Sequence, residues 1–337
     1  MFLFDIFFYS FVAIITIAML FVFRSSAARS KLAKTGKAIV VLLGVLAWVW
    51  LVAIWILPKG SKWQEAVNLP KHLSTLSMMP ATDADGEQLS YGTDEKQYML
   101  YWPAAGNNPS KDKVIFYWHG GGWHTGSPEQ HRHLARLLSE QGYTVYSFAY
   151  RLGPTYGYDA IREDANEGVL FALEHLKQQG VENPKIVLGG TSAGGNVAGL
   201  LAYDEQRWLD LKLDRNQLKG FFSIVGVLNL DHMEQTYVLQ NYAGLASDST
   251  YRLANPIAYL STADTIPLLC LHGNKDGLVP IGGVESFCDA ARGIAPNDVH
   301  LHTFEECTHL EVGSAWYYEE DLRIGQDSVL VDWLARL

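Results

Sequence analysis

The chain has 337 residues, of which 48% are hydrophobic and 18% are charged, and its formal net charge is −10 at pH 7. This length fits one large α/β domain with an appendage. Residues 1–58 carry five Lys or Arg and one Asp, a net charge of +4, which leaves −14 for residues 59–337. An acidic globular part argues against nucleic acid as a partner and against electrostatic attachment to anionic lipid. Three cysteines, an odd number, exclude a fully paired disulfide framework within the chain.

Two apolar stretches near the N-terminus, residues 6–23 and 38–57, contain no charged side chain. Each is long enough to cross about 30 Å of hydrocarbon as a helix. The alternative for the first is a signal peptide, but no Lys or Arg precedes it and Asp5 stands where positive charge is expected. The alternative for the second is a buried core helix. We expect a hairpin of two transmembrane helices over residues 1–58.

The segment between these stretches, residues 24–37, holds five basic residues and no acidic one. The positive-inside rule therefore places it in the cytoplasm, with both termini and the globular part on the exoplasmic side. Trp48, Trp50 and Trp55 fall in the outer half of the second span, where an aromatic belt is expected.

Residues 59–90 are rich in proline and lack long apolar runs, so we expect a connector there, followed by a globular domain over 91–337. Short β-branched or aromatic runs and amphipathic runs alternate along this domain. The pattern predicts an α/β fold with a mostly parallel sheet covered by helices on both faces. The expected strands are 97–103, 113–118, 142–150, 185–188, 221–227, 267–273 and 299–304, and the expected helices are 130–141, 158–179, 196–202 and one within 315–337.

The strand expected at 113–118 runs into His119-Gly120-Gly121-Gly122-Trp123. Such a glycine run lets the main chain approach a substrate oxygen and supply N–H groups to an oxyanion hole. We assign Gly121, Gly122 and, further on, Ala193 as donors. The alternative is a flexible turn. His119, Trp123 and His124 are expected to line the substrate pocket.

Gly190-Thr191-Ser192-Ala193-Gly194 is a G-x-S-x-G sequence between an expected strand and an expected helix. Strand, sharp turn and helix are the context of a nucleophile elbow, in which Ser192 is the nucleophile. Asp276 follows the strand expected at 267–273, and His309 lies in the loop after the last strand. The order Ser192, Asp276, His309 is the one this elbow requires. His300 and His302 lie within a strand, and His272 lies within an earlier one.

One further region is expected to support the site. Residues 229–265 lack long apolar periodicity and are expected to form a wall or cap facing the substrate. The aromatic residues there, including Tyr237, Tyr242 and Tyr251, either stack on a sugar or aryl group or form the core of the cap itself. No Cys and His cluster has metal-ligand spacing, so we expect no metal and no cofactor.

From about residue 98 to 337 the chain resembles the α/β-hydrolases. Its His119–Trp123 and Gly190–Asn196 segments are similar to those of hormone-sensitive-lipase-like and related bacterial carboxylesterases, a group that includes acetyl- and feruloyl-esterases and arylformamidases. Tyr150-Arg151-Leu152-Gly153-Pro154 also resembles a segment of this group, with Gly153 in place of the usual alanine. Asp164 resembles an acidic position of the group, and the resemblance implies that it pairs with Arg151 and orients the loop below the oxyanion strand, a structural role. The motifs are specific for fold and chemistry and weakly specific for substrate.

Together with the expected membrane hairpin, the resemblance implies a membrane-anchored serine hydrolase that cleaves short-acyl or aryl carboxylic esters, such as esters of glycans, through an acyl-enzyme on Ser192. Alternatives within the class are an amidase, an arylformamidase or a prenylcysteine methylesterase. The last would need an active site that faces the cytoplasm. Alternatives outside the class are a non-catalytic binding module on a hydrolase fold and a scaffold or sensor whose membrane hairpin carries the function. The acyl chain, the alcohol and the oligomeric state do not follow from the sequence.

Overall fold

A computed structural model describes residues 13–14, 16–17, 31–78, 86–106, 108–262, 264–296, 298–314 and 325–337. The chain divides into two compact units, Met1–Pro80 and Ala81–Leu337. Most of the first expected span, 6–23, lies outside the described residues.

The first unit contains two long helices, α2 (Lys31–Ile56) and α3 (Lys62–Met78). Within α2, Ala38–Ile56 is long and apolar enough to cross a membrane, and it coincides with the second expected span. Two spans are expected from the sequence, and this is the one such helix in the part of the chain that the structure describes. The helix α3 lies in the range expected to be a connector.

The second unit is built on one eight-stranded sheet with the order β1-β2-β4-β3-β5-β6-β7-β8. The strands β1 and β4 pair with β2 in antiparallel fashion, and the other pairs are parallel, as expected for a mostly parallel sheet. The first strand lies within the expected connector 59–90, so the sheet begins before residue 91. The strands are β1 (Glu87–Ser90), β2 (Tyr98–Trp102), β3 (Ser110–Trp118), β4 (Tyr143–Phe148), β5 (Lys185–Thr191), β6 (Leu218–Ile224), β7 (Leu268–Gly273) and β8 (Val299–Phe304).

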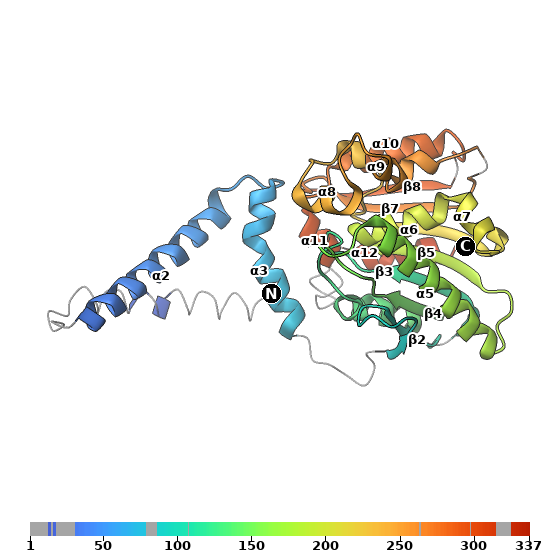
Figure 1. Cartoon of the computed structure of the whole chain (residues 1–337), viewed down its shortest axis with the longest axis horizontal. Helices are drawn as coiled ribbons and strands as arrows, with labels where there is room; N and C mark the ends of the chain where they lie inside the picture. Colours follow the sequence, from blue (N-terminus) through green and yellow to red (C-terminus); the bar gives the residue numbers. More distant parts are fainter. Residues whose placement is uncertain are drawn as a thin grey trace. The chain divides into compact units, whose positions relative to one another are not determined.

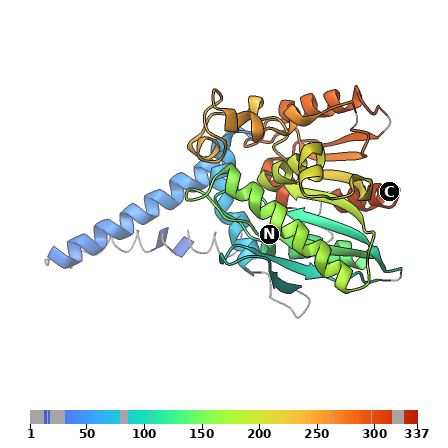
Figure 2. The ribbon, with the colours of Figure 1, turned by 45° about the vertical axis from the view of Figure 1, so that its right-hand side comes forward.

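Helices cover both faces of this sheet because the central strands are apolar on both sides. Along β3, Val114 and Phe116 pack on one face with α5, α6 and α10, while Ile115 and Tyr117 pack on the other with α4 and α12. Figures 1 and 2 show α5 crossing one face of the strands. The helices of this unit are α4 (Arg132–Glu140), α5 (Tyr158–Gln178), α6 (Ala193–Tyr203), α7 (Glu205–Asp210), α8 (Tyr237–Ala243), α9 (Ser249–Leu253), α10 (Ile281–Arg292), α11 (His309–Ser314) and α12 (Gln326–Leu334).

The parallel strands β3, β5, β7 and β8 end at the same edge of the sheet. The loops that follow them therefore converge, and each carries one of the residues singled out from the sequence. The expected cap, 229–265, consists of the short helices α8 and α9 and two single turns of 3₁₀-helix, Leu230–His232 and Pro256–Tyr259.

Candidate active site

Ser192 occupies a strained turn between β5 and α6. Its backbone adopts φ 53° and ψ −117°, a conformation that a residue with a side chain rarely adopts, and its N–H donates to the carbonyl of Ile224 at 2.8 Å. A side chain at Gly190 would collide with the backbone of Gly194, and one at Gly194 would collide with the carbonyl oxygen of Trp118. The two glycines are therefore required for space, and the turn has one well-defined shape.

The structure brings Ser192, His309 and Asp276 into one hydrogen-bonded chain. His309 Nε2 lies 3.0 Å from Ser192 Oγ, and His309 Nδ1 lies 2.8 Å from Asp276 Oδ2. Asp276 Oδ1 accepts the backbone N–H groups of Leu278 at 2.9 Å and Val279 at 2.7 Å. An imidazole held in this way can take a proton from the serine hydroxyl while the carboxylate fixes its tautomer.

The buried carboxylate of Asp276 stays ionised in this arrangement. Burial by itself raises the pKa of Asp276, but the charge and hydrogen bond of His309, with smaller contributions from His272 and the Val279 N–H, outweigh burial and hold the pKa below its usual value. At neutral pH the Asp276 carboxylate therefore provides a negative charge beside the His309 imidazole.

The glycine loop after β3 presents free N–H groups. Gly121 has φ 119° and Gly122 has φ 60°, conformations that favour glycine. The N–H and hydroxyl of Thr125 both donate to the Gly121 carbonyl at 3.0 Å, which holds the loop in place. Among the described residues, none accepts the N–H of Gly121 or Gly122. Ala193 begins α6, so its N–H has no partner within the helix.

The sequence predicts that His119 lines the pocket, but the structure buries it. Its side chain is 1% exposed, stacks on the Tyr150 ring at 4.3 Å, and lies with Nδ1 2.7 Å from the Gly120 carbonyl. The Tyr150 hydroxyl in turn donates to the His119 carbonyl at 2.9 Å. Burial lowers the pKa of His119 to about 4, so the ring is neutral at pH 7. His119 directly follows Trp118, the last residue of β3, and its buried side chain supports the loop from beneath.

Trp123 is also buried, at 3% exposed, and stacks on Tyr242 of α8 with ring centroids 4.1 Å apart. Of the three expected pocket residues only His124 is partly exposed, and its Nε2 lies 2.8 Å from Oδ1 of Asn241. The glycine loop is thus attached to the cap through both of these side chains.

The cap packs over the glycine loop through α8. A side chain at Gly122 would lie 3.3 Å from Cγ1 of Val238, so Val238 stands next to the expected oxyanion site. Of the cap tyrosines, Tyr242 and Tyr251 are buried while Tyr237 is 70% exposed. The first two therefore belong to the core of the cap, and Tyr237 alone of the three presents its ring to solvent.

One residue that the sequence did not single out touches this site. His272, near the end of β7, is fully buried, and its Nε2 lies 3.2 Å from Asp276 Oδ2. The sequence interpretation set it aside because it lies within a strand. Its spacing of four residues from Asp276, across the strand end, was the available signal.

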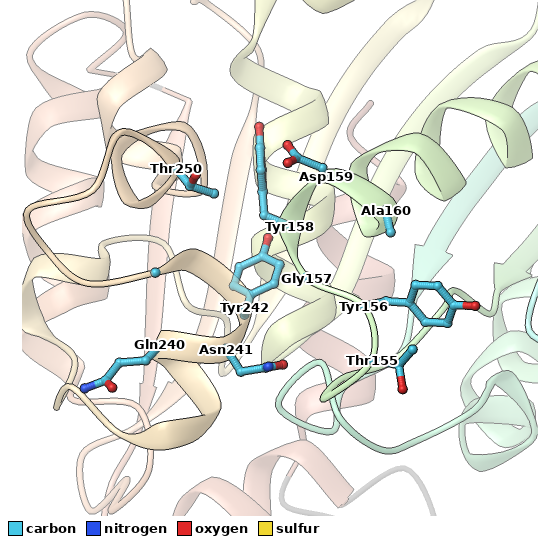
Figure 3. Close-up of a pocket in the computed structure, with 11 residues that line it drawn as sticks. Thr155, Tyr156, Gly157, Tyr158, Asp159, Ala160, Gln240, Asn241, Tyr242 and Thr250 are labelled. Carbon is cyan, nitrogen blue, oxygen red and sulfur yellow. The ribbon is translucent and has the colours of Figure 1, made fainter.

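A hollow of about 420 Å³ lies between the start of α5 and the end of α8 (Figure 3). Residues 155–160 line one side, and Gln240, Asn241, Tyr242, Gly244 and Thr250 line the other. None of the three residues of the hydrogen-bonded chain lines it, so we locate the site by the geometry of Ser192 and not by this hollow. In the described parts of the chain, no group of three His, Cys, Asp or Glu residues is arranged to hold a metal ion.

The sheet order, the strained serine turn and the hydrogen-bonded chain define an α/β-hydrolase. The family model described as BD-FAE matches residues 99–289, more than half of the chain, and the chain belongs to this family.

Curated relatives and solved structures agree with this placement. The chain is 25% identical over 261 residues to isoprenylcysteine alpha-carbonyl methylesterase ICME of Arabidopsis thaliana, a match that covers 72% of this chain and 59% of the relative. It is 34% identical over 110 residues to esterase LipI of Mycobacterium tuberculosis, covering 31% of this chain and 32% of that protein. The chain thus spans less than two thirds of these relatives.

Among solved structures, the esterase Est2 of Thermogutta terrifontis with bound propionate matches with a TM-score of 0.60 at 21% identity, covering 75% of this chain and 94% of that one. A truncated carbohydrate esterase from gut microbiota matches with a TM-score of 0.64 at 13% identity, covering 76% and 98%. At these identities the likeness establishes the fold.

Proposed function

We propose that this protein is a serine hydrolase of carboxylic esters. The observation that carries the proposal is the chain Ser192, His309, Asp276, with distances of 3.0 and 2.8 Å, next to glycine N–H groups that no described residue accepts. A non-catalytic module would have no need for a strained serine in contact with a histidine base.

The reaction proceeds in two halves. Ser192 Oγ attacks the ester carbonyl carbon while His309 Nε2 takes its proton, and the resulting oxyanion accepts hydrogen bonds from Gly121, Gly122 and Ala193. The intermediate expels the alcohol, which receives the proton from His309 and leaves an acyl group on Ser192. A water molecule then gives a proton to His309 and attacks the acyl carbon, and the acid departs as the proton returns to Ser192.

The substrates we propose are short-acyl or aryl esters. The cap residue Val238 stands beside Gly122, and the stacked rings of Trp123 and Tyr242 fill the space behind the glycine loop. The names of the relatives support ester hydrolysis, since ICME, LipI and Est2 are all described as esterases.

We propose further that the chain is anchored in a membrane, with the hydrolase unit on the exoplasmic side. The apolar helix Ala38–Ile56 and the five basic residues of 24–37 support this topology. The first span, residues 6–23, completes the proposed hairpin, and the hydrogen bond from Trp48 Nε1 to Thr16 Oγ1, 3.1 Å long, is consistent with two adjacent helices.

The test is hydrolysis of 4-nitrophenyl esters with acyl chains of two to twelve carbons by the full chain in detergent, beside Ser192→Ala. We expect turnover that falls with chain length and is lost in the variant. If the folded wild type neither hydrolyses any of these esters nor reacts with a fluorophosphonate probe, the proposal is wrong.

The match to ICME over 72% of this chain favours one second candidate, an isoprenylcysteine methylesterase. Hydrolysis of the methyl ester of farnesylated cysteine distinguishes the two candidates. The ester proposal predicts that each active site turns over 4-nitrophenyl acetate faster than this methyl ester. Protease accessibility of the hydrolase unit in sealed membrane vesicles provides the second criterion, since the methylesterase function requires the cytoplasmic side.

A further inference from the structure

A second imidazole lies behind the acid of the proposed catalytic chain. His272 is 0% exposed, and its Nε2 lies 2.9 Å from the carbonyl oxygen of Val279 and 3.2 Å from Asp276 Oδ2. Its Nδ1 is buried, with no hydrogen-bond partner among the described residues. A carbonyl can only accept, so we assign the proton to Nε2 and leave Nδ1 bare.

The ring is neutral in this position. Burial lowers the pKa of His272 and outweighs the opposing effect of the Asp276 charge. The groups that face it are Asp276 from the loop after its own strand, His309 from α11 and Glu285 from α10. The single N–H of this neutral ring donates to the Val279 carbonyl, and the same nitrogen lies 3.2 Å from Asp276 Oδ2, so the ring keeps its polar edge beside the carboxylate.

The carboxylate of Asp276 is thereby held on both oxygens. Oδ1 accepts from the N–H groups of Leu278 and Val279, and Oδ2 faces both His309 Nδ1 and His272 Nε2. Val279 closes a ring of contacts, because its N–H donates to Asp276 and its carbonyl accepts from His272. A rotation of the carboxylate away from His309 would break the contacts on both sides at once.

We propose that His272 is a positioning residue that orients the Asp276 carboxylate toward His309 and partly compensates the negative charge of that carboxylate. This inference rests on the proposed ester-hydrolase function. His272 reaches neither Ser192 nor the glycine loop in any contact of the described structure, so its effect passes through Asp276.

Loss of this donor has two expected effects. The carboxylate becomes freer to turn, so kcat falls by about 2-fold to 10-fold, the range for one ordinary polar contact. The less satisfied carboxylate also favours protonated His309, so the acid limb of the kcat/KM profile moves to higher pH by roughly half a unit. KM changes little, because no substrate contact is lost.

Three variants of the full chain in detergent test this. His272→Leu removes the donor, His272→Asn places an amide nearer the position of Nδ1, and His272→Gln places an N–H near the position of Nε2. Rates are normalised to the fraction that reacts with a fluorophosphonate. We expect His272→Leu and His272→Asn to show the fall in kcat and the shifted acid limb, and His272→Gln to restore both. If His272→Leu does not fold, the comparison of His272→Asn with His272→Gln tests the inference.

A core-filling role predicts another pattern, in which melting temperature changes while the normalised kcat and pH profile stay at wild-type values in all three variants. That pattern overturns the inference and leaves the ester-hydrolase function intact. If the wild-type protein shows no ester turnover, both the inference about His272 and the ester-hydrolase function are contradicted. In an Asp276→Asn background, His272→Leu should cause no further loss of kcat, and an additive loss would also contradict the proposal.

Discussion

Asp164 on α5 and Asp276 after β7 are both buried carboxylates, and their surroundings differ in one respect. Asp164 accepts from the Arg151 backbone N–H at 2.7 Å, from Arg151 Nε at 2.8 Å and from Gln97 Nε2 at 2.9 Å, and Arg151 Nη2 forms an ion pair with its Oδ1 at 2.7 Å. Asp276 accepts two backbone N–H groups and faces two imidazoles. One carboxylate has a permanent cation as its partner, and the other has a base that can gain and lose a proton.

This difference assigns the two regions different tasks. The hydrogen bonds of Asp164 raise the pKa of Arg151 above its ordinary value, so the guanidinium stays charged at every pH at which the protein folds. The pair therefore holds the end of β4 to α5, as the sequence predicts for Arg151 and Asp164. In the mechanism we propose, the histidine beside Asp276 makes the same kind of buried acid part of a proton-transfer chain.

The largest expected effect separates the two regions by activity. Asp276→Asn keeps the shape of the side chain but removes its charge and permits the wrong His309 tautomer, so kcat should fall by about 10³-fold to 10⁴-fold with little change in melting temperature. Steady-state kinetics with 4-nitrophenyl acetate measure it, and Ser192→Ala sets the floor. An Asp276→Asn variant within tenfold of wild type would mean that the carboxylate is structural, like Asp164.

The reciprocal change should act on stability. Asp164→Ala leaves Arg151 partly buried without its main partner, which should lower the free energy of unfolding by about 3–5 kcal/mol. Urea denaturation of the full chain measures this, and kcat per fluorophosphonate-reactive molecule should stay within a few-fold of wild type. A loss of kcat like that of Asp276→Asn would show that the two regions do not divide the tasks.

Acid should destabilise the fold through His119, which stacks on the residue before Arg151. Its pKa in the folded state is about 4, below the ordinary 6.5, so the unfolded chain binds the proton first. The neutral His119 makes its full contribution to the free energy of unfolding above about pH 6.5. This contribution, roughly 3 kcal/mol in all, is lost as the pH falls toward 4.

Unfolding free energies at pH 7, 5.5 and 4.5 measure this dependence. His119→Phe keeps the stacking on Tyr150 and should give a flatter curve over the same interval. Equal acid sensitivity in wild type and His119→Phe would assign the effect to other groups.

The smallest expected effect tests the geometry of the cation. Arg151→Lys keeps the charge but loses the planar guanidinium, which contacts Asp164 through Nε and Nη2. The free energy of unfolding should therefore be about 1–3 kcal/mol lower than that of the wild type. Thermal unfolding beside Asp164→Ala measures it. A stability equal to wild type would show that charge alone, without the planar contacts, holds this region.

Much of the site was accessible from sequence because its constraints are local. The turn at Ser192 needs small neighbours, and Gly190 and Gly194 have room for no side chain. The order Ser192, Asp276, His309 follows from strands that end at one edge of a parallel sheet. A short buried strand before each loop is enough to predict where these side chains meet.

Only the tertiary structure decided the surroundings of these residues. His119 and Trp123 are adjacent to the proposed oxyanion glycines in sequence, yet both are buried against Tyr150 and Tyr242 from distant segments. In the sequence, His272 has the pattern of an ordinary strand residue. Only the structure shows that the loop after β7 returns and brings Val279 and Asp276 into contact with it. Sequence patterns record what the backbone needs locally, whereas contacts between distant segments depend on packing that no local pattern specifies.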